Sequence, residues 1–174
     1  MSQKDWTEPF RRARHSAVHL ELRDTYAVPA EAERFAHWCE TGTVDVERDA
    51  IENRHVWMNL VREMVAKGVL VRRARVVSEP VTPYIRWLHA ITPANLAAGE
   101  RVRWLPRREA ADIAVPGTDF WLIDDELVRF GHFDGAGDLV SHELRTDAPV
   151  VALCRNAFEQ VWDRAYDHEG FKIR

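Results

Sequence analysis

Apolar and polar residues alternate with two different periods along this chain, and the period changes near residue 68. Between residues 29 and 67, apolar positions recur every three or four residues, which is typical of helices packed on one side. Beyond Gly68, stretches such as "GVLVRRARVV" and "ERVRWLPR" alternate in steps of two, which is typical of strands. Shorter helical patterns separate these strands. The order predicts an α/β or α+β fold whose sheet lies in the second half of the chain.

The first 68 residues are expected to form a mainly helical region. A short strand is predicted around "AVHLELRD", where apolar residues alternate with His19 and Glu21. A helix should begin at Pro29 and end at Gly42. A second is predicted over 47–67, ending at Lys67-Gly68. The residues expected to face inward from these two helices include Phe35, Trp38, Cys39, Ile51, Trp57 and Val65.

The core of the fold is expected over residues 69–174. Strands are predicted in "GVLVRRARVV", "ERVRWLPR", "DFWLI", "ELVRFGHF" and "LVSHEL", and helices in "PYIRWLHAI" and "REAADIA". The acidic pair Asp124-Asp125 fits the turn of a hairpin between two of these strands. A long final helix is predicted after Asp147, a suitable N-cap residue, because apolar positions from Val150 to Ala165 recur at helical spacing.

Length and composition limit the functional classes. A chain of 174 residues predicts a single domain, residues 1–174. The net charge of −4 is unlike that of a stand-alone nucleic-acid-binding protein. The absence of an apolar run long enough for a membrane span, together with two isolated cysteines, leads us to expect a cytoplasmic, reduced protein. The preference for arginine over lysine is typical of a GC-rich bacterial genome.

The stretch "PGTDFWLIDDELVRFGHFDG", residues 116–135, resembles the motif of the phospholipase D superfamily, H-x-K-x-x-x-x-D-x-x-x-x-x-x-G-(G or S)-x-N. Asp124 aligns with the motif aspartate, Gly131 with the first glycine and Asp134 with the asparagine. "AFEQVWDRA" is similar to the helix that commonly ends such domains. The resemblance implies a phospholipase D-like mixed sheet flanked by helices. It also makes a homodimer plausible, because proteins of that family with a single motif usually pair.

In the same alignment, two catalytic residues of that family are missing from this chain. Gly117 occupies the position of the nucleophilic histidine, and Asp119 occupies that of the lysine that neutralises phosphoryl oxygens. Glycine offers no nucleophile, and an aspartate would repel an anion in a partly dry pocket. We therefore expect a degenerate site without phosphodiesterase activity.

Over the whole chain, "VVSEPVTPYIRW", "AGERVRWLPRREA", "PGTDFWLIDDELVRFGHFDG" and "LCRNAFEQVWDRA" resemble an uncharacterised actinomycete family of single-domain proteins. Its members are often encoded near helix-turn-helix regulators. The resemblance implies no established reaction or cofactor. It implies a regulatory role and a protein partner, plausibly such a regulator.

Three groups of residues are candidates for a ligand site. Glu79, Tyr84 and Arg86 follow a predicted strand, where α/β proteins often bind ligands; alternatively, the prolines beside them only shape a turn. Arginines on neighbouring strands and loops could bind phosphate, RNA or an acidic partner, or could form a solvated, salt-bridged face. This second group includes Arg72, Arg73, Arg75, Arg101, Arg103, Arg107 and Arg108.

The third group lies in the hairpin. Alternation places Asp119 and Trp121 on one face and Phe120 and Leu122 on the other, with His132 on the returning strand. An aromatic wall beside a carboxylate suits a cationic or hydrogen-bond-donating ligand. No metal is expected, because neither the aspartates nor the histidines have the spacing of a metal site.

These observations favour a non-enzymatic regulatory or ligand-sensing protein. One alternative is a small enzyme that uses Glu79, Asp119 or His132 as an acid or base. A second is a nucleic-acid-associated protein that uses the arginine strands.

Overall fold

A mixed sheet of seven strands divides the molecule, of which the computed structural model describes residues 6–174. The strand order is β6-β5-β4-β1-β2-β3-β7, with β2 parallel to β1 and β3 and all other neighbours antiparallel. The strands are β1 (Ser16–Glu21), β2 (Leu70–Val77), β3 (Arg101–Pro106), β4 (Phe120–Ile123), β5 (Leu127–Phe133), β6 (Leu139–Arg145) and β7 (Tyr166–Asp167).

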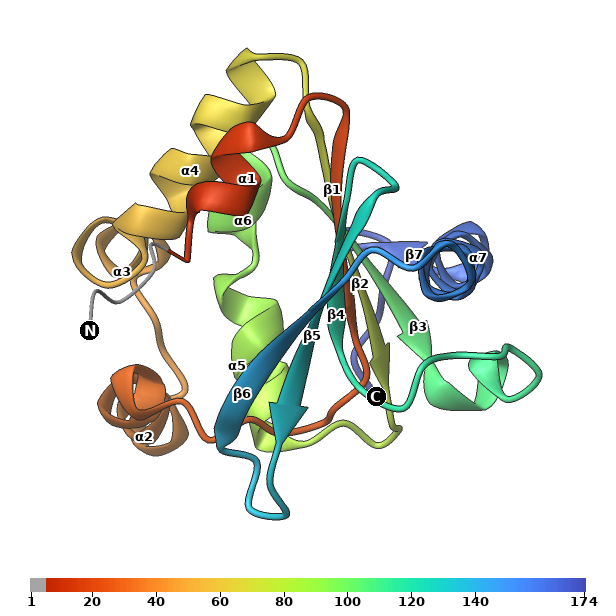
Figure 1. Cartoon of the computed structure of the whole chain (residues 1–174). Helices are drawn as coiled ribbons and strands as arrows, with labels where there is room; N and C mark the ends of the chain where they lie inside the picture. Colours follow the sequence, from red (N-terminus) through yellow and green to blue (C-terminus); the bar gives the residue numbers. More distant parts are fainter. Residues whose placement is uncertain (1–5) are drawn as a thin grey trace.

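Helices cover both faces of the sheet, so the protein has three layers (Figure 1). The long helix α7 (Ala148–Arg164) crosses one face and contacts β1 to β5. The other face is covered by α1 (Glu8–Arg12), α2 (Ala32–Thr41), α3 (Val46–Glu52), α4 (His55–Ala66), α5 (Pro83–Ile91) and α6 (Pro93–Ala97). Two short 3₁₀ turns, η1 (Pro29–Glu31) and η2 (Arg107–Ala110), complete the elements. A mixed sheet with flanking helices confirms the predicted α+β class.

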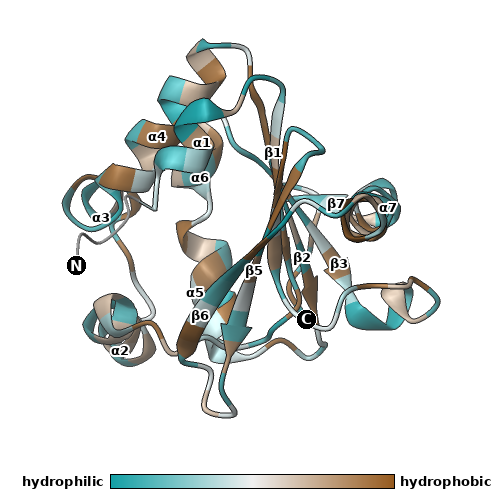
Figure 2. Ribbon diagram, in the orientation of Figure 1, coloured by the Kyte–Doolittle hydropathy of each residue, from teal (hydrophilic) through white to brown (hydrophobic). Residues whose placement is uncertain are grey.

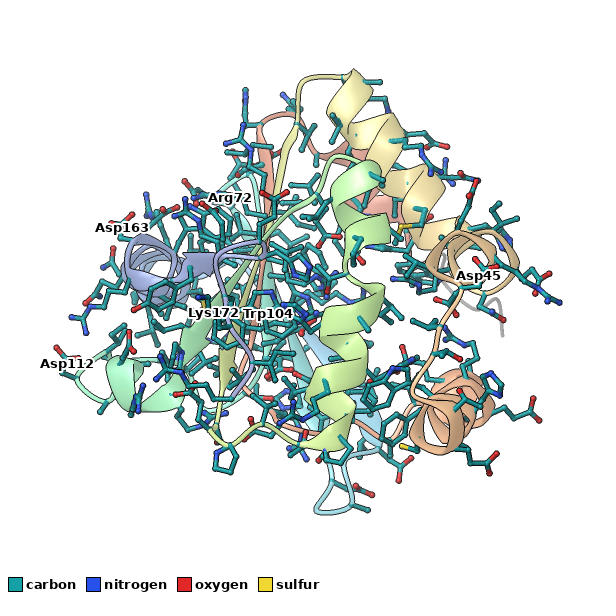
Figure 3. All side chains as sticks on the ribbon, turned by 180° about the vertical axis from the view of Figure 1, so that it is seen from behind. Asp45, Arg72, Trp104, Asp112, Asp163 and Lys172 are labelled. Carbon is teal, nitrogen blue, oxygen red and sulfur yellow. The ribbon has the colours of Figure 1, made fainter. Side chains whose placement is uncertain are left out.

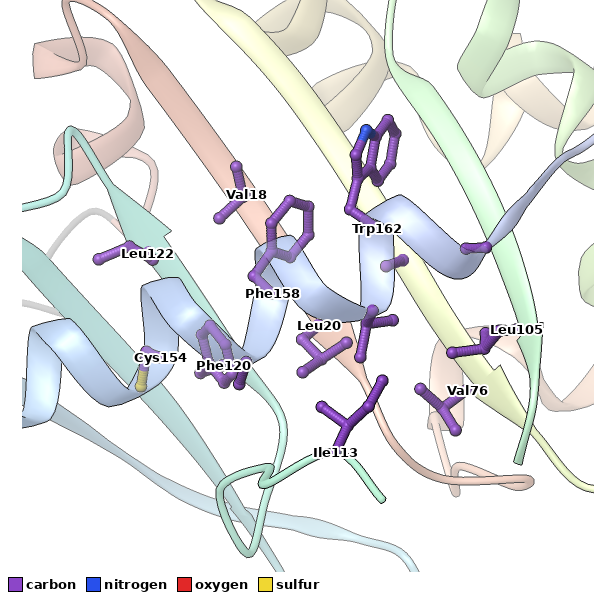
Figure 4. Close-up of a cluster of buried hydrophobic side chains, with 14 of the residues drawn as sticks. Val18, Leu20, Val76, Leu105, Ile113, Phe120, Leu122, Cys154, Phe158 and Trp162 are labelled. Carbon is purple, nitrogen blue, oxygen red and sulfur yellow. The ribbon is translucent and has the colours of Figure 1, made fainter. Parts of the chain in front are cut away.

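The face toward α7 carries a large apolar core. Val18 and Leu20 of β1 and Leu122 of β4 pack against Cys154 and Phe158 of α7 (Figure 4). Alternation along each strand produces this face, because every second residue points the same way. The hydropathy colouring shows the same arrangement, with the apolar side of α7 turned toward the sheet (Figure 2). Seen from behind, Asp45 marks the layer of α1 to α6, and Asp112 marks the opposite side of the sheet (Figure 3).

The N-terminal region is part of this architecture. Its strand β1 lies in the middle of the sheet, between β4 and β2, and α4 packs on β2 through Leu60, Val61 and Met64. Residues 6–68 therefore supply a central strand as well as the helices α1 to α4, and they pack on the sheet.

The single helix predicted over 47–67 is wrong, because the chain forms two helices, α3 and α4, that meet at Asn53-Arg54. The break allows Arg54 to bond to Asp49, to Asn95 and to the carbonyl oxygen of Ile91. These bonds fix a side chain that a continuous helix would direct elsewhere.

Five smaller predictions also need correction. Cys39, Ile51 and Val65 were expected to face inward, but all three are exposed, Ile51 to 64% and Val65 to 38%. Asp147 makes no capping bond to α7, because its carboxylate accepts a bond from Arg145 Nε at 2.7 Å instead. "REAADIA" forms only the 3₁₀ turn η2 and a loop.

Candidate functional site

The sheet face toward α1–α6 changes from apolar to polar in its middle. At the same end of the three central strands, each strand carries on this face an apolar residue that belongs to the core cluster of α1, α4 and α6. Toward the other end of the strands, this face carries polar and aromatic groups. The apolar residues are Ala17, Val71 and Ile123; the residues that follow on the same face are His19 and Glu21, Arg73 and Arg75, and Trp121 and Asp119.

A cavity of about 290 Å³ lies over this polar block, between the sheet and the helical layer. We call it the polar cleft. The segment 26–31 and α5 form its roof, and β5 and β6 form one side. Besides the polar block of the sheet, the lining includes Tyr26, Val28, Glu31, Tyr84, Leu88, Arg129, Gly131, Phe133, Leu139 and His142. A second hollow of about 330 Å³ shares Val28, Glu31, Arg73, Arg75 and Leu88 with the first, so the two adjoin. The size suits a small organic molecule.

Two arginines of the polar cleft are already neutralised. Arg73 and Arg75 both donate hydrogen bonds to Glu21, and Arg73 Nε donates a second bond to Glu100 Oε1 at 2.7 Å. Burial alone would raise the pKa of Glu21, but the charges of Arg75 and Arg73 outweigh it and hold this pKa well below its usual range. Buried ion pairs of this kind need complete hydrogen bonding to be tolerated. These two arginines therefore shape the floor of the cleft and have little charge left for a ligand.

Asp119 is buried at the wall of the polar cleft. Its Oδ1 accepts a bond from the backbone N–H of Leu22 at 2.8 Å, and its Oδ2 accepts one from the hydroxyl of Tyr26. Burial raises the pKa of Asp119 to about 6, even though the bond from Tyr26 favours the charged form. The carboxyl group is thus poised to be protonated or ionised near neutral pH.

His19 and Trp121 form an aromatic wall. They sit directly opposite each other on β1 and β4, and His19 Nδ1 lies 3.3 Å from Glu21 Oε1 without the geometry of a hydrogen bond. Burial and the charge of Arg73 lower the pKa of His19 well below its ordinary value. The imidazole is therefore neutral and serves as a flat surface.

Arg129 differs from the other arginines of the polar cleft. It lies opposite Trp121 in the β4–β5 pairing, and it has no acidic partner within 4.0 Å among residues 6–174. The side chain is half-buried, and burial lowers its pKa. Among residues 6–174, Arg129 is therefore the lining arginine whose charge has no acidic partner and can pair with a ligand.

The structure brings four of the eight predicted site residues together. Asp119, Trp121, Tyr84 and Arg75 line the polar cleft, and the Tyr84 hydroxyl donates to Glu31 Oε2 at 2.5 Å.

The other four residues lie elsewhere. Glu79 pairs with Arg108 at 3.2 Å beside a separate hollow near the C-terminus, and Arg86 is exposed on α5. His132 contacts Glu143 at 3.0 Å on the face of β5 opposite to Arg129. Arg103 pairs with Asp167 and lies over Trp162, on the α7 side.

Sequence reasoning missed Glu21, Tyr26 and Arg129. A signal for Glu21 was present, since charged residues alternate with apolar ones on β1 and on β2, but alternation alone is equally typical of a solvated face. Arg129 carries no motif. Tyr26 lies in an irregular segment whose path only the tertiary structure defines.

The residues that align with the phospholipase D motif do not lie together in the structure. Gly117 is exposed in the loop before β4, whereas Asp119 is buried. Asp124 lies at the hairpin turn, where its carboxylate accepts bonds from the backbone N–H groups of Arg14, His15 and Ser16. Asp134 accepts bonds from three backbone N–H groups of its own turn, those of residues 136–138. Asp134 therefore stabilises its own turn, whereas Asp124 sits at the predicted hairpin turn and binds the backbone of residues 14–16.

Two further properties bear on the class of protein. Within residues 6–174, no group of three or more His, Cys, Asp or Glu side chains is arranged to hold a metal ion. In the same range, no helix combines the length and apolar character that crossing a membrane requires.

The fold and the cleft define an α+β protein with a small, polar, aromatic-walled cavity beneath a helical layer. The model of a family described as a domain of unknown function (DUF6879) matches residues 4–173, so the chain belongs to that family. No curated protein shows a significant match to the chain.

Two solved structures are similar to the chain. One is Nuc, a phospholipase D family member from Salmonella typhimurium, with a TM-score of 0.49 and 12% identity over 92% of this chain and 86% of that one. The other is TrmBL2, an archaeal chromatin protein whose structure shows a novel mode of DNA binding, with a TM-score of 0.44 and 18% identity. That likeness covers 92% of this chain but 48% of TrmBL2, so the chain spans about half of that protein. Both TM-scores are below 0.5.

Proposed function

We propose that the protein is a non-enzymatic ligand sensor whose polar cleft binds a small aromatic molecule with one anionic group. The observation that carries the proposal is the unpaired, half-buried guanidinium of Arg129 at the wall of the cleft. A carboxylate or phosphate would supply the counterion that it lacks. The flat His19–Trp121 surface beside it suits an aromatic ring.

The charges of the cleft favour an anion over the cationic ligand suggested by Asp119 and Trp121 alone. Both oxygens of Asp119 already accept hydrogen bonds within the fold, so the carboxyl group has less capacity left to bind a cation. Glu21 is neutralised by two arginines. Glu31, also in the lining, accepts a hydrogen bond from the Tyr84 hydroxyl. Arg129 is therefore the charged lining residue that has neither an ion pair nor a side-chain hydrogen bond among residues 6–174.

The enzyme alternative has less support. Glu79, Asp119 and His132 occupy three separate places: a distal hollow, the polar cleft and the opposite face of β5. They cannot act on one substrate as a set. Asp119 alone remains available as an acid or base, without a nucleophile beside it.

The nucleic-acid alternative meets a similar difficulty. The arginines of the strands do not form one patch: Arg72 pairs with Glu159 on the α7 side, whereas Arg73 and Arg75 lie in the polar cleft. Each of these three arginines has an acidic partner. The finer expectations, a cytoplasmic location and a helix-turn-helix regulator as partner, stay proposals that co-purification from the native host would test.

Benzoate is a suitable probe, because it combines one carboxylate with one aromatic ring. We expect titration followed by NMR to shift the indole N–H signal of Trp121 and the side-chain signals of Arg129, with a dissociation constant on the order of millimolar for so small a ligand. Benzylamine, with the opposite charge, should not shift them.

The matched pair of variants is Arg129→Met and Arg101→Met. Arg101 is exposed on β3 and is absent from the polar cleft. We expect benzoate affinity to fall at least about tenfold in Arg129→Met, the loss of one charge-assisted contact, and to be unchanged in Arg101→Met. Equal affinity in the two variants, or binding of benzylamine in place of benzoate, would overturn the proposal.

A further inference from the structure

Strand β6 leaves one edge of the sheet open. It is the outermost strand, and six of its seven residues are exposed. Among residues 6–174, its backbone makes ladder bonds to β5 alone, so the outward row of N–H and C=O groups has no protein partner. The opposite edge is different, because β7 has only two residues and leaves little edge to pair.

This open edge is also apolar. Val140 is 66% exposed, Leu144 55% and Leu139 48%. The strand contains neither proline nor glycine, and no lysine blocks it. Native proteins usually protect edges with short strands, proline, charge or β-bulges, because an exposed apolar edge invites another strand to pair. The charged residues of β6 are Glu143 and Arg145, and its bulge lies at the start of the strand, so the pairing with β5 is regular from Ser141 to Arg145. The edge therefore has the properties of an interface.

The pairing with β5 defines which residues of β6 share a face. His142 lies opposite Gly131, and Leu144 lies opposite Arg129, which lines the polar cleft. Val140, His142 and Leu144 therefore face the side of the helices α1–α6, and Ser141, Glu143 and Arg145 face the α7 side.

We propose that a second copy of the chain pairs antiparallel with this edge, β6 against β6, with the two-fold axis passing between the two His142 residues. In this register, Val140 faces Leu144 of the second copy, and Ser141 faces Glu143. The two sheets then continue as one through residues 140–144 of each strand, and Leu139 lies beyond the bulge that shifts the β5–β6 pairing.

The side chains select a second copy and this register. Apolar residues meet apolar residues in both Val140–Leu144 pairs, and no like charges lie directly opposite. If the second strand were shifted by two residues in one direction, Glu143 would lie opposite Glu143. If it were shifted by two residues in the other direction, Val140 would lie opposite His142. Only even shifts keep both copies' helical layers on the same side of the sheet. The strand is thus complementary to itself in one register.

The interface would border both ligand sites. Leu139 and His142 line the polar cleft and also belong to β6, so a dimer would bring the second copy's strand to the margin of each cleft. This inference does not depend on the ligand, since it stands on the exposure and pattern of β6.

Sedimentation velocity of the full chain tests the association. We expect the wild-type protein to sediment as a dimer of twice 20.2 kDa at sub-millimolar concentration. The double variant Val140→Lys, Leu144→Lys should be monomeric, with the dissociation constant raised at least about a hundredfold, because pairing would desolvate unpaired ammonium groups. Both positions are exposed, so the monomer should keep its circular dichroism spectrum. The control Ile51→Lys, at an apolar position 64% exposed on α3, should remain dimeric.

A cysteine cross-link tests the register. In a Cys39→Ser background, His142→Cys should form an intermolecular disulfide on oxidation, because the two positions face each other directly. Val140→Cys should cross-link poorly, because position 140 faces position 144. A wild-type protein that stays monomeric overturns the proposal, even if β6 pairs with a different protein. A dimer that persists in the double lysine variant overturns the interface, and efficient cross-linking at 140 but not at 142 overturns the register.

Discussion

The imidazole of His19 lies parallel to the indole of Trp121, with ring centroids 4.2 Å apart and an angle of 13° between the planes. The strand register produces this contact, because the two residues are direct partners in the β1–β4 ladder. The floor beside them is closed by Arg73, which lies over the Trp121 ring at 5.3 Å. A neutral imidazole is required for this arrangement, since a cation there would add to the charge of the neighbouring arginine.

The pKa of His19 should therefore be lower than that of an exposed histidine. Burial lowers its pKa and Arg73, Arg75 and Arg129 add to the effect, while Glu21 opposes it. We expect NMR titration to show His19 still neutral at its ordinary value of 6.5. Because the pKa is lower in the folded state, its contribution to stability is present above pH 6.5 and is lost as the pH falls through the folded-state pKa. Protonation of His19 at or above 6.5 would contradict the buried, cation-flanked wall.

Asp119 should make the free energy of unfolding depend on pH with the opposite sign to His19. Its pKa is raised from 3.8 to about 6 by burial, so its contribution to stability is complete below about pH 4 and is lost as the pH rises through 6. The difference corresponds to at most about 3 kcal/mol of unfolding free energy.

The Asp119→Asn variant isolates this effect, because the amide can keep a bond to the N–H of Leu22 but cannot ionise. Urea unfolding at pH 4 and pH 8 measures it. The free energy of unfolding of the variant, taken relative to that of the wild-type protein, should be higher at pH 8 than at pH 4. Parallel curves for the two proteins would show that Asp119 ionises as freely as an exposed aspartate.

Asp124 should anchor the N-terminal segment to the hairpin. Its carboxylate accepts bonds from the N–H groups of Arg14 at 2.9 Å, His15 at 2.8 Å and Ser16 at 2.9 Å. Asp124→Ala should lower the free energy of unfolding by about 2–3 kcal/mol, because three backbone donors lose a charged acceptor. Asp125→Ala is the matched control, since Asp125 has nearly the same left-handed backbone, with φ of 55° against 53°. A similar loss in both variants would attribute the effect to backbone strain alone.

The fold was largely predictable, and the site was predictable in part. Periodicity located α7 and the strands β2 to β6. In α7 and β2 to β5 it reflects buried positions, whereas β6 is exposed along nearly its whole length. Asp119 and Trp121 were placed on one face by alternation alone, and the structure shows them so. The two-helix break at Asn53 depends on bonds from Arg54 to residues as distant as Asn95, which no local pattern contains.

The site residues that the sequence did not reveal were missed for the same reason: their role depends on tertiary structure. Glu21 and Arg73 are charged residues on strands, a pattern shared with any solvated sheet face. What makes them a buried floor is the layer of α2–α5 above them, which only tertiary packing defines. Arg129 becomes significant because acidic residues pair with its neighbours and not with it, a property of the complete arrangement of charges.

The crystal structure of the protein grown with benzoate is the most direct test of a cleft that binds aromatic anions. We expect the carboxylate within hydrogen-bond distance of the Arg129 guanidinium, and the ring against the wall of His19 and Trp121. Benzoate bound only outside the polar cleft, or inside it with the carboxylate turned away from Arg129, would contradict the account.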